Sequence, residues 1–330
     1  MAKARSSEAK LARLRQLRGA SAASQLLQEL RGFLGDASNF VVADAAELVG
    51  EARLTDLAPD LAAAYVRFLD NPVKKDKLCR AKIAIVDALN KLEFADEEFY
   101  LRGIRYVQRE PAWGEPVDAA APIRVACAFG LVRIRYRGVL ALLVDLLTDP
   151  EKGVRAGAAR ALAYSGTEAA GLLLRLKARL GDAESEVVSE CLSGIVELNP
   201  EQSVRFVAEF IATPPAEVQE AALLALASSR RPEAFEVLKS FAEKQRGELQ
   251  EVAHLALALL RLPAATDYLL TLLADESQTA ASTALAALAV HRHDPGVRQR
   301  VATVVAGRRD AALQSLFERR FGGDQADGDG

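Results

Sequence analysis

Apolar and small residues recur along the chain at helical spacing, in blocks separated by short polar turns. The clearest block begins at Asp149, continues with Val154, Ala158 and Leu162, and ends at Gly166. An Asp in the turn, apolar positions three or four residues apart and a Gly after the last of them are start and stop signals of an amphipathic helix. The block therefore predicts one helix with an apolar face.

The same block recurs, which makes the chain a repeat array. The Leu162 position is aliphatic in every copy, and the Ala161 position is small in all but the first, where Leu48 stands. Five residues before the Val154 position, six of eight copies have Asp, a residue that accepts hydrogen bonds from N–H groups at a helix start. The positions equivalent to Val154, 31 to 42 residues apart, are Val41, Ala81, Ile123, Val187, Val218, Leu249 and Ala280.

Each of these helices is preceded by another apolar segment, so each copy is a helix pair. A single pair cannot bury its apolar face alone, and the pairs must stack on one another. The sequence predicts an all-α solenoid of about eight pairs, with capping helices over 6–18 and about 297–320. The predicted first helices are 26–35, 58–69, 98–107, 139–147, 169–180, 204–211, 234–241 and 266–273.

The repeat resembles the HEAT-repeat family in a short form of about 30 residues found in bacterial proteins. The resemblance spans about 24–292, although the first three copies are longer and the Arg155 position is basic only at Lys82, Arg124 and Arg155. It implies a right-handed α-solenoid that binds proteins. The residues that carry it are Asp149, Val154, Arg155, Ala158, Ala159, Ala161, Leu162 and Gly166. The predicted divisions are an N-terminal cap (1–23), irregular repeats (24–137), regular repeats (138–292), a C-terminal cap (293–321) and a disordered tail (322–330).

Composition and charge limit the secondary-structure class, the kind of partner and the cell compartment that we expect for this chain. Half the residues are hydrophobic but only 6% are aromatic, which favours packed helices over strands. A net charge of −3 argues against nucleic acid as a general partner. Three cysteines make no disulfide framework, and no apolar run is long enough to span a membrane. We expect a cytoplasmic protein.

The residues that most often carry chemistry fall at structural positions of the repeat. Cys127 and Cys191 occupy the small Ala158 position, and His254 occupies the apolar Ala159 position, which predicts a half-buried structural histidine. His291 and His293 lie at a predicted helix end with nothing nearby to complete a metal site. No phosphate-binding loop or nucleophile motif occurs. We therefore expect no catalytic residue, metal or cofactor.

Arginines at the ends of the second helices form the first candidate binding surface. They lie twelve residues after the Val154 position, while Glu186, Glu217 and Glu248 stand one residue before it. Both sets suit the helix dipole, but in-phase stacking would also align them into a basic and an acidic stripe. The edge formed by Arg230, Arg261 and Arg292 would contact an acidic protein surface. The arginines of the basic stripe are Arg53, Arg135, Arg230, Arg261 and Arg292.

The second candidate is an insertion in the third copy, around the single Trp. Pro111 and Pro116 stiffen this loop on either side of Trp113. Two interpretations are open: Trp113 binds a partner, or it folds back over its own helix pair. Nearby, Arg133 and Arg137 flank Arg135 in a basic run that is either an anion-binding patch or a solvated face.

These observations favour a non-catalytic scaffold or adaptor that binds another protein on its solenoid surface. Two enzyme classes with HEAT-like architecture are the alternatives: bilin lyases and isomerases, and alkylated-base DNA glycosylases. The negative charge and the lack of an aromatic cluster beside the basic residues weigh against the glycosylase.

Overall fold

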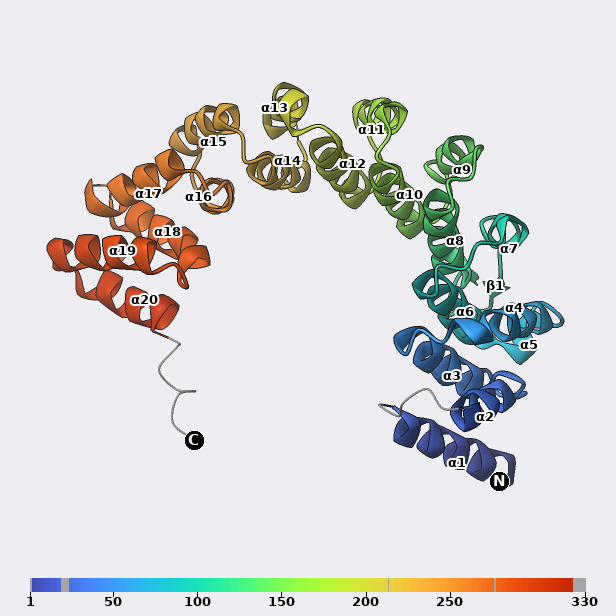
Figure 1. Ribbon diagram of the computed structural model, residues 1–330. Helices are drawn as coiled ribbons and strands as arrows, with labels where there is room; N and C mark the ends of the chain where they lie inside the picture. Colours follow the sequence, from blue (N-terminus) through green and yellow to red (C-terminus); the bar gives the residue numbers. More distant parts are fainter. Residues whose placement is uncertain (1, 19–23, 213, 276, 323–330) are drawn as a thin grey trace. The chain divides into compact units, whose positions relative to one another are not determined.

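The computed structural model describes residues 2–18, 24–212, 214–275 and 277–322, and it divides into two compact units, Met1–Ser165 and Gly166–Gly330. Each unit is a stack of antiparallel helix pairs (Figure 1). Among the described helices, none is long and apolar enough to cross a membrane.

The first unit contains four helix pairs, which are α2 with α3, α4 with α6, α7 with α8, and α9 with α10. The second helices α3, α6, α8 and α10 pack on one another in order, and α1 packs on α3. A two-stranded sheet lies between α7 and α8. The elements are α1 (Ala2–Leu17), α2 (Ser24–Leu34), α3 (Asn39–Glu51), α4 (Ala58–Arg67), α5 (Pro72–Lys75), α6 (Arg80–Lys91), α7 (Glu97–Gly103), β1 (Arg109–Glu110), β2 (Val117–Asp118), α8 (Ala121–Arg133), α9 (Val139–Leu146) and α10 (Lys152–Tyr164), with 3-10 turns at Thr55–Leu57 and Lys77–Cys79.

The second unit also contains four pairs, followed by two closing helices. The second helices α12, α14, α16 and α18 pack in order, and the closing helices α19 and α20 contact α17 and α18. The elements are α11 (Glu168–Leu180), α12 (Ser185–Leu198), α13 (Pro200–Ala208), α14 (Ala216–Ser228), α15 (Pro232–Lys244), α16 (Glu248–Leu259), α17 (Pro263–Asp275), α18 (Gln278–Leu288), α19 (Pro295–Arg308) and α20 (Ala311–Phe321), with 3-10 turns at Glu209–Ala212 and Ala289–His291.

The predicted all-α solenoid of helix pairs is confirmed. All eight residues at the Leu162 position are buried, from Val49 to Leu288, and so are all eight at the Ala161 position. Small residues there do permit close packing. At Gly130 an added Cβ would lie 2.3 Å from Cε1 of Tyr100, so the α7–α8 contact requires glycine.

The cysteines and His254 are core residues. Cys127 and Cys191 are fully buried, as predicted, and Cys79 is buried as well. Burial raises the pKa of all three thiols, that of Cys79 and Cys191 to about 12. The exposed fraction of His254 is only 1%, so this residue is more deeply buried than predicted.

Four features differ from the sequence predictions or fall outside the described residues. The short helix α5 adds length to the second pair, and the third pair contains the small β-sheet, which an all-α prediction omits. His291, predicted at the surface, is half-buried, and its Nε2 lies 2.9 Å from the carbonyl oxygen of Ala258. The predicted disordered tail lies outside the described residues apart from Gly322.

Candidate functional site

The insertion that holds Trp113 is a β-hairpin between α7 and α8. Its strands pair antiparallel, with Arg109 opposite Asp118 and Glu110 opposite Val117. The backbone N–H of Ala119 extends the pairing by donating to the carbonyl oxygen of Gln108 at 3.0 Å. The hairpin is therefore anchored at the base, next to the helix pair.

Two buried polar side chains attach the hairpin to the preceding repeat. Gln108 Nε2 donates to the carbonyl oxygen of Asp76 at 3.0 Å and to Glu110 Oε1 at 2.6 Å. Glu110 Oε1 also accepts from the backbone N–H of Leu78 at 2.6 Å, and Tyr106 Oη donates to Gln108 Oε1 at 2.7 Å. Since Gln108 and Glu110 are almost fully buried, these bonds are shielded from water, which fixes the base of the hairpin.

Asp118, at the end of β2, joins the hairpin to the next repeat through Arg124. Asp118 accepts from the backbone N–H groups of Gln108 and Ala120, both at 3.0 Å. Arg124 binds Asp118 with Nη1 at 2.5 Å and Asp149 with Nε and Nη2, each at 3.0 Å. Burial opposes ionisation of Asp118, but these hydrogen bonds and the Arg124 charge outweigh it and lower the pKa of Asp118.

The same arrangement explains why Asp recurs five residues before the Val154 position. Asp36, Asp118, Asp149 and Asp182 each accept the backbone N–H of the residue two places later. Each of these carboxylates also has a basic partner, which is Lys10, Arg124 or Lys177. Asp76 differs, since it is fully buried and caps α6 through the N–H groups of Ala81 and Lys82 while pairing with Lys82 Nζ at 2.8 Å.

Sequence reasoning predicted the capping role of these aspartates but missed their ion pairs. The available signal was the co-occurrence of Asp with a basic residue six positions later, in Asp76 with Lys82 and Asp118 with Arg124. The polar anchors Gln108 and Glu110 were missed as well. No periodic pattern marks them, because their partners belong to another repeat.

The tip of the hairpin is exposed, and Trp113 does not fold back over the helices. Trp113 has an exposed fraction of 106%, the largest among the exposed large hydrophobic residues. Val117 in β2 and Val107 just before β1 are about half exposed. Exposed aromatic residues on a fixed loop are typical of protein-binding sites.

The arginines of the predicted stripe are exposed and share an unusual backbone position. Arg135, Arg230 and Arg261 follow α8, α14 and α16 and have φ angles of 57°, 52° and 56°, the left-handed conformation that normally favours glycine. Gly166, with φ 67°, occupies the same position after α10, and Arg53 occupies it after α3 with φ 50°. The sequence located these residues at helix ends but did not predict the left-handed geometry.

Arg292 differs, because it follows a 3-10 turn with φ −54° and its Nε donates to His293 Nε2 at 3.1 Å. Within the described parts of the chain, the guanidinium groups of Arg135, Arg230 and Arg261 have no hydrogen-bond or ion-pair partner. Glu186, Glu217 and Glu248 lie in the first turns of α12, α14 and α16, where the helix dipole favours them. The structure therefore places the acidic and basic sets at opposite ends of the second helices.

Comparison with known proteins gives one family match, over part of the chain. Residues 117–192 match the family model for HEAT repeats. None of the curated proteins compared with the chain matches its sequence. A chain from the complex of CpcE and CpcF of the phycocyanin lyase of Nostoc sp. PCC7120 is 16% identical over 92% of this chain and 97% of its own, with a TM-score of 0.36. An engineered protein is 18% identical over 94% and 98%, with a TM-score of 0.35.

Likeness at this level does not carry a function from either structure to this chain. The repeat itself is better defined: the family match covers the repeats that contain Arg124, Asp149 and Cys191, and the same buried positions recur in the other pairs. Residues 117–192 of this chain are therefore HEAT repeats.

Proposed function

We propose that this protein is a non-catalytic interaction scaffold that binds another protein, with the hairpin tip around Trp113 as its principal contact. The observation that carries the proposal is the contrast within the hairpin. Its base is fixed by buried hydrogen bonds through Gln108 and Glu110, while the indole at the tip lies entirely in solvent. Because the base of the hairpin is fixed, its backbone loses less conformational entropy on binding than a free loop would, which favours affinity.

The exposed arginines supply the second part of the proposal. Arg230 and Arg261 follow α14 and α16, which pack on each other. Arg292 follows the 3-10 turn after α18, and α18 packs on α16. Three cations along one edge of the second unit would attract an acidic protein surface and speed its association. Arg135 offers a similar cation in the first unit.

The decisive experiment places a photo-crosslinking amino acid at position 113 and identifies what it captures in the native cell extract. Binding of the same protein is then compared for wild type, Trp113→Ala and Tyr164→Ala. Tyr164 is the matched control, because it is also an exposed aromatic residue, with an exposed fraction of 55%, but lies on α10. We expect Trp113→Ala to weaken binding at least about tenfold, as for a central interface aromatic.

A second variant removes the tip of the loop while keeping the fold. Replacing residues 111–116 by Asn-Gly joins the two strands through a two-residue turn and leaves the buried base intact. We expect an unchanged far-ultraviolet circular dichroism spectrum and loss of the captured protein. If the Asn-Gly variant and Trp113→Ala bind that protein as tightly as wild type, the proposal is wrong.

For the arginines, the test is Arg230→Glu with Arg261→Glu in one variant. We expect a slower association rate and a weaker dependence of that rate on salt. An unchanged association rate at low salt would show that these arginines do not contribute to the interface.

A further inference from the structure

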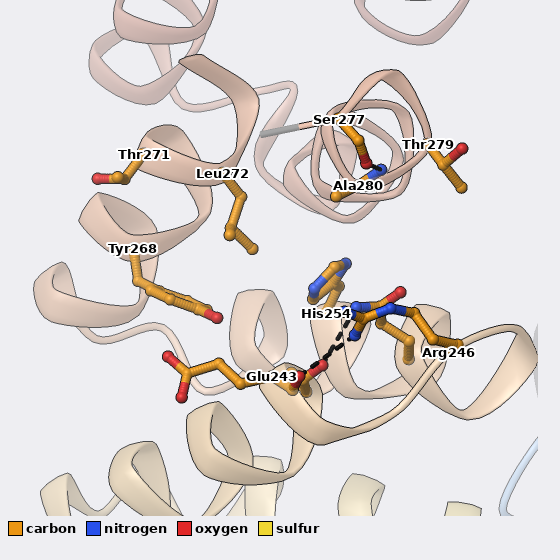
Figure 2. Close-up of a pocket in the computed structure, with 11 residues that line it drawn as sticks. Glu243, Arg246, His254, Tyr268, Thr271, Leu272, Ser277, Thr279 and Ala280 are labelled. Atoms are coloured by element: carbon orange, nitrogen blue, oxygen red, sulfur yellow. Dashed lines mark hydrogen bonds between the residues drawn. The ribbon is translucent and has the colours of Figure 1, made fainter. Parts of the chain in front are cut away.

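A small polar pocket lies in the second unit, at a distance in sequence from the hairpin. It lies between α15, α16, α17 and the start of α18 and has a volume of about 300 Å³. Its lining includes Glu243, Arg246, His254, Tyr268, Leu272 and Ser277, and Figure 2 shows the His254 ring in the middle of the labelled side chains. The volume is at the lower end of the range for small-ligand pockets.

The hydrogen bonds around His254 determine which ring nitrogen carries the proton. Nδ1 lies 2.8 Å from Thr283 Oγ1, and that hydroxyl donates to the carbonyl oxygen of Ala280 at 3.0 Å. A hydroxyl has one proton to donate, so Thr283 accepts from Nδ1–H. The neutral ring then leaves Nε2 unprotonated. Nε2 is a hydrogen-bond acceptor, and no described residue bonds to it.

The ring stays neutral at physiological pH, since burial lowers the pKa of His254 to about 4. His254 lines the pocket, so a group bound there that supplies a donor completes the hydrogen bonding of Nε2. The repeat does not require this histidine, because Leu192, Leu223 and Leu285 occupy the same position in other pairs.

Arg246 supplies donors at the same pocket. Its Nη1 donates to the carbonyl oxygen of Glu243 at 3.2 Å (Figure 2) and to that of Gln245 at 2.7 Å, and these bonds hold the guanidinium in place. Nε and Nη2 of Arg246 have no partner in the part of the chain that the structure describes. Glu243 and Arg246 are the two charged side chains of the lining and balance each other, so the pocket favours neither a cation nor an anion. Tyr268 adds an aromatic side chain.

We propose that this pocket binds a planar, uncharged amide group, which donates an N–H to His254 Nε2 and accepts from Arg246 through its carbonyl oxygen. Such a group has both functions on one edge. The amide belongs either to a free aromatic or heterocyclic amide or to a glutamine or asparagine side chain of another protein. The site is independent of the hairpin and of the scaffold function proposed above.

The test compares three probes of equal size and different charge: benzamide, benzoate and benzamidine. The intact chain is labelled with ¹⁵N at its three histidines, and the ring nitrogens are followed during titration. We expect benzamide to shift the His254 signals and to bind more tightly than benzoate or benzamidine. His293, which is exposed, serves as the internal reference and should not shift.

The matched variant is His254→Leu, which installs the residue that other repeats have at this position. We expect it to fold and to bind benzamide about tenfold more weakly, as for the loss of one well-formed hydrogen bond. A parallel titration with N-acetyl-glutamine methylamide identifies the source of the amide: tighter binding than benzamide indicates a protein side chain, and weaker binding a free aromatic amide. The proposal is overturned if neither amide shifts His254, if a charged probe binds more tightly, or if His254→Leu binds benzamide as well as wild type.

Discussion

At the residue scale, arginines with left-handed backbone angles occupy positions where glycine would be more favourable. A side chain with a positive φ costs about 1 kcal/mol, and Gly166 shows that this repeat accepts glycine at the position. Backbone stability therefore does not explain the arginines at these positions, which are Arg135, Arg230 and Arg261. This strain is consistent with a role in binding.

Arg261→Gly is accordingly expected to raise the free energy of unfolding by up to about 1 kcal/mol, because it relieves the positive φ. Chemical denaturation followed by circular dichroism measures the change. Arg292→Gly is the matched control and should not stabilise the protein, because Arg292 has φ −54°. A loss of stability in Arg261→Gly would show instead that the arginine side chain supports the helix end.

His254 predicts a pH dependence of stability. Its pKa in the folded protein, about 4, lies below the ordinary value of 6.5, so the unfolded chain binds the proton first as the pH falls. The contribution of neutral His254 is complete above pH 6.5 and is lost between pH 6.5 and 4, by about 3 kcal/mol in all. His254→Leu removes this group, so the unfolding free energy of wild type minus that of the variant should fall by about 3 kcal/mol as the pH falls from 6.5 to 4. A difference independent of pH would contradict the prediction.

At the scale of the element, the second helices were predictable and the hairpin was not. A helix of twelve or so residues repeats its apolar positions several times, and eight copies reinforce the signal. The strands of the hairpin have two residues each, too few to show alternation. Its anchors, Gln108 and Glu110, depend on partners near Asp76, more than thirty residues away. The sequence located the loop and its Trp but not what fixes them.

The contact between Arg124, Asp118 and Asp149 joins two successive pairs and gives a second prediction at this scale. Arg124→Met leaves two nearly buried carboxylates without their cation and should lower the free energy of unfolding by about 3 kcal/mol. Arg137→Met, at an exposed position in the same unit, should change it by less than about 0.5 kcal/mol. Equal effects of the two substitutions would refute the bridging role of Arg124.

At the scale of the whole molecule, stability is distributed over repeats that contact mainly their neighbours. A cavity in one repeat should therefore loosen that repeat and the adjacent ones more than distant ones. Leu257→Ala, at a fully buried position of α16, should cost about 3 kcal/mol and speed hydrogen exchange most in α14, α16 and α18. Uniform acceleration along residues 2–18 and 24–322 would show instead that the array unfolds as a single cooperative unit.

The burial of the cysteines has a practical consequence for labelling the protein. Thiols react as thiolates, and Cys79, Cys127 and Cys191 are both inaccessible and held protonated by their raised pKa values. A cysteine substituted for Trp113 would be the only accessible, readily ionised thiol in the folded chain. A maleimide dye would then attach at one known point, on the loop proposed to meet the partner. Single-site fluorescence and cross-linking experiments therefore do not require removal of the native cysteines.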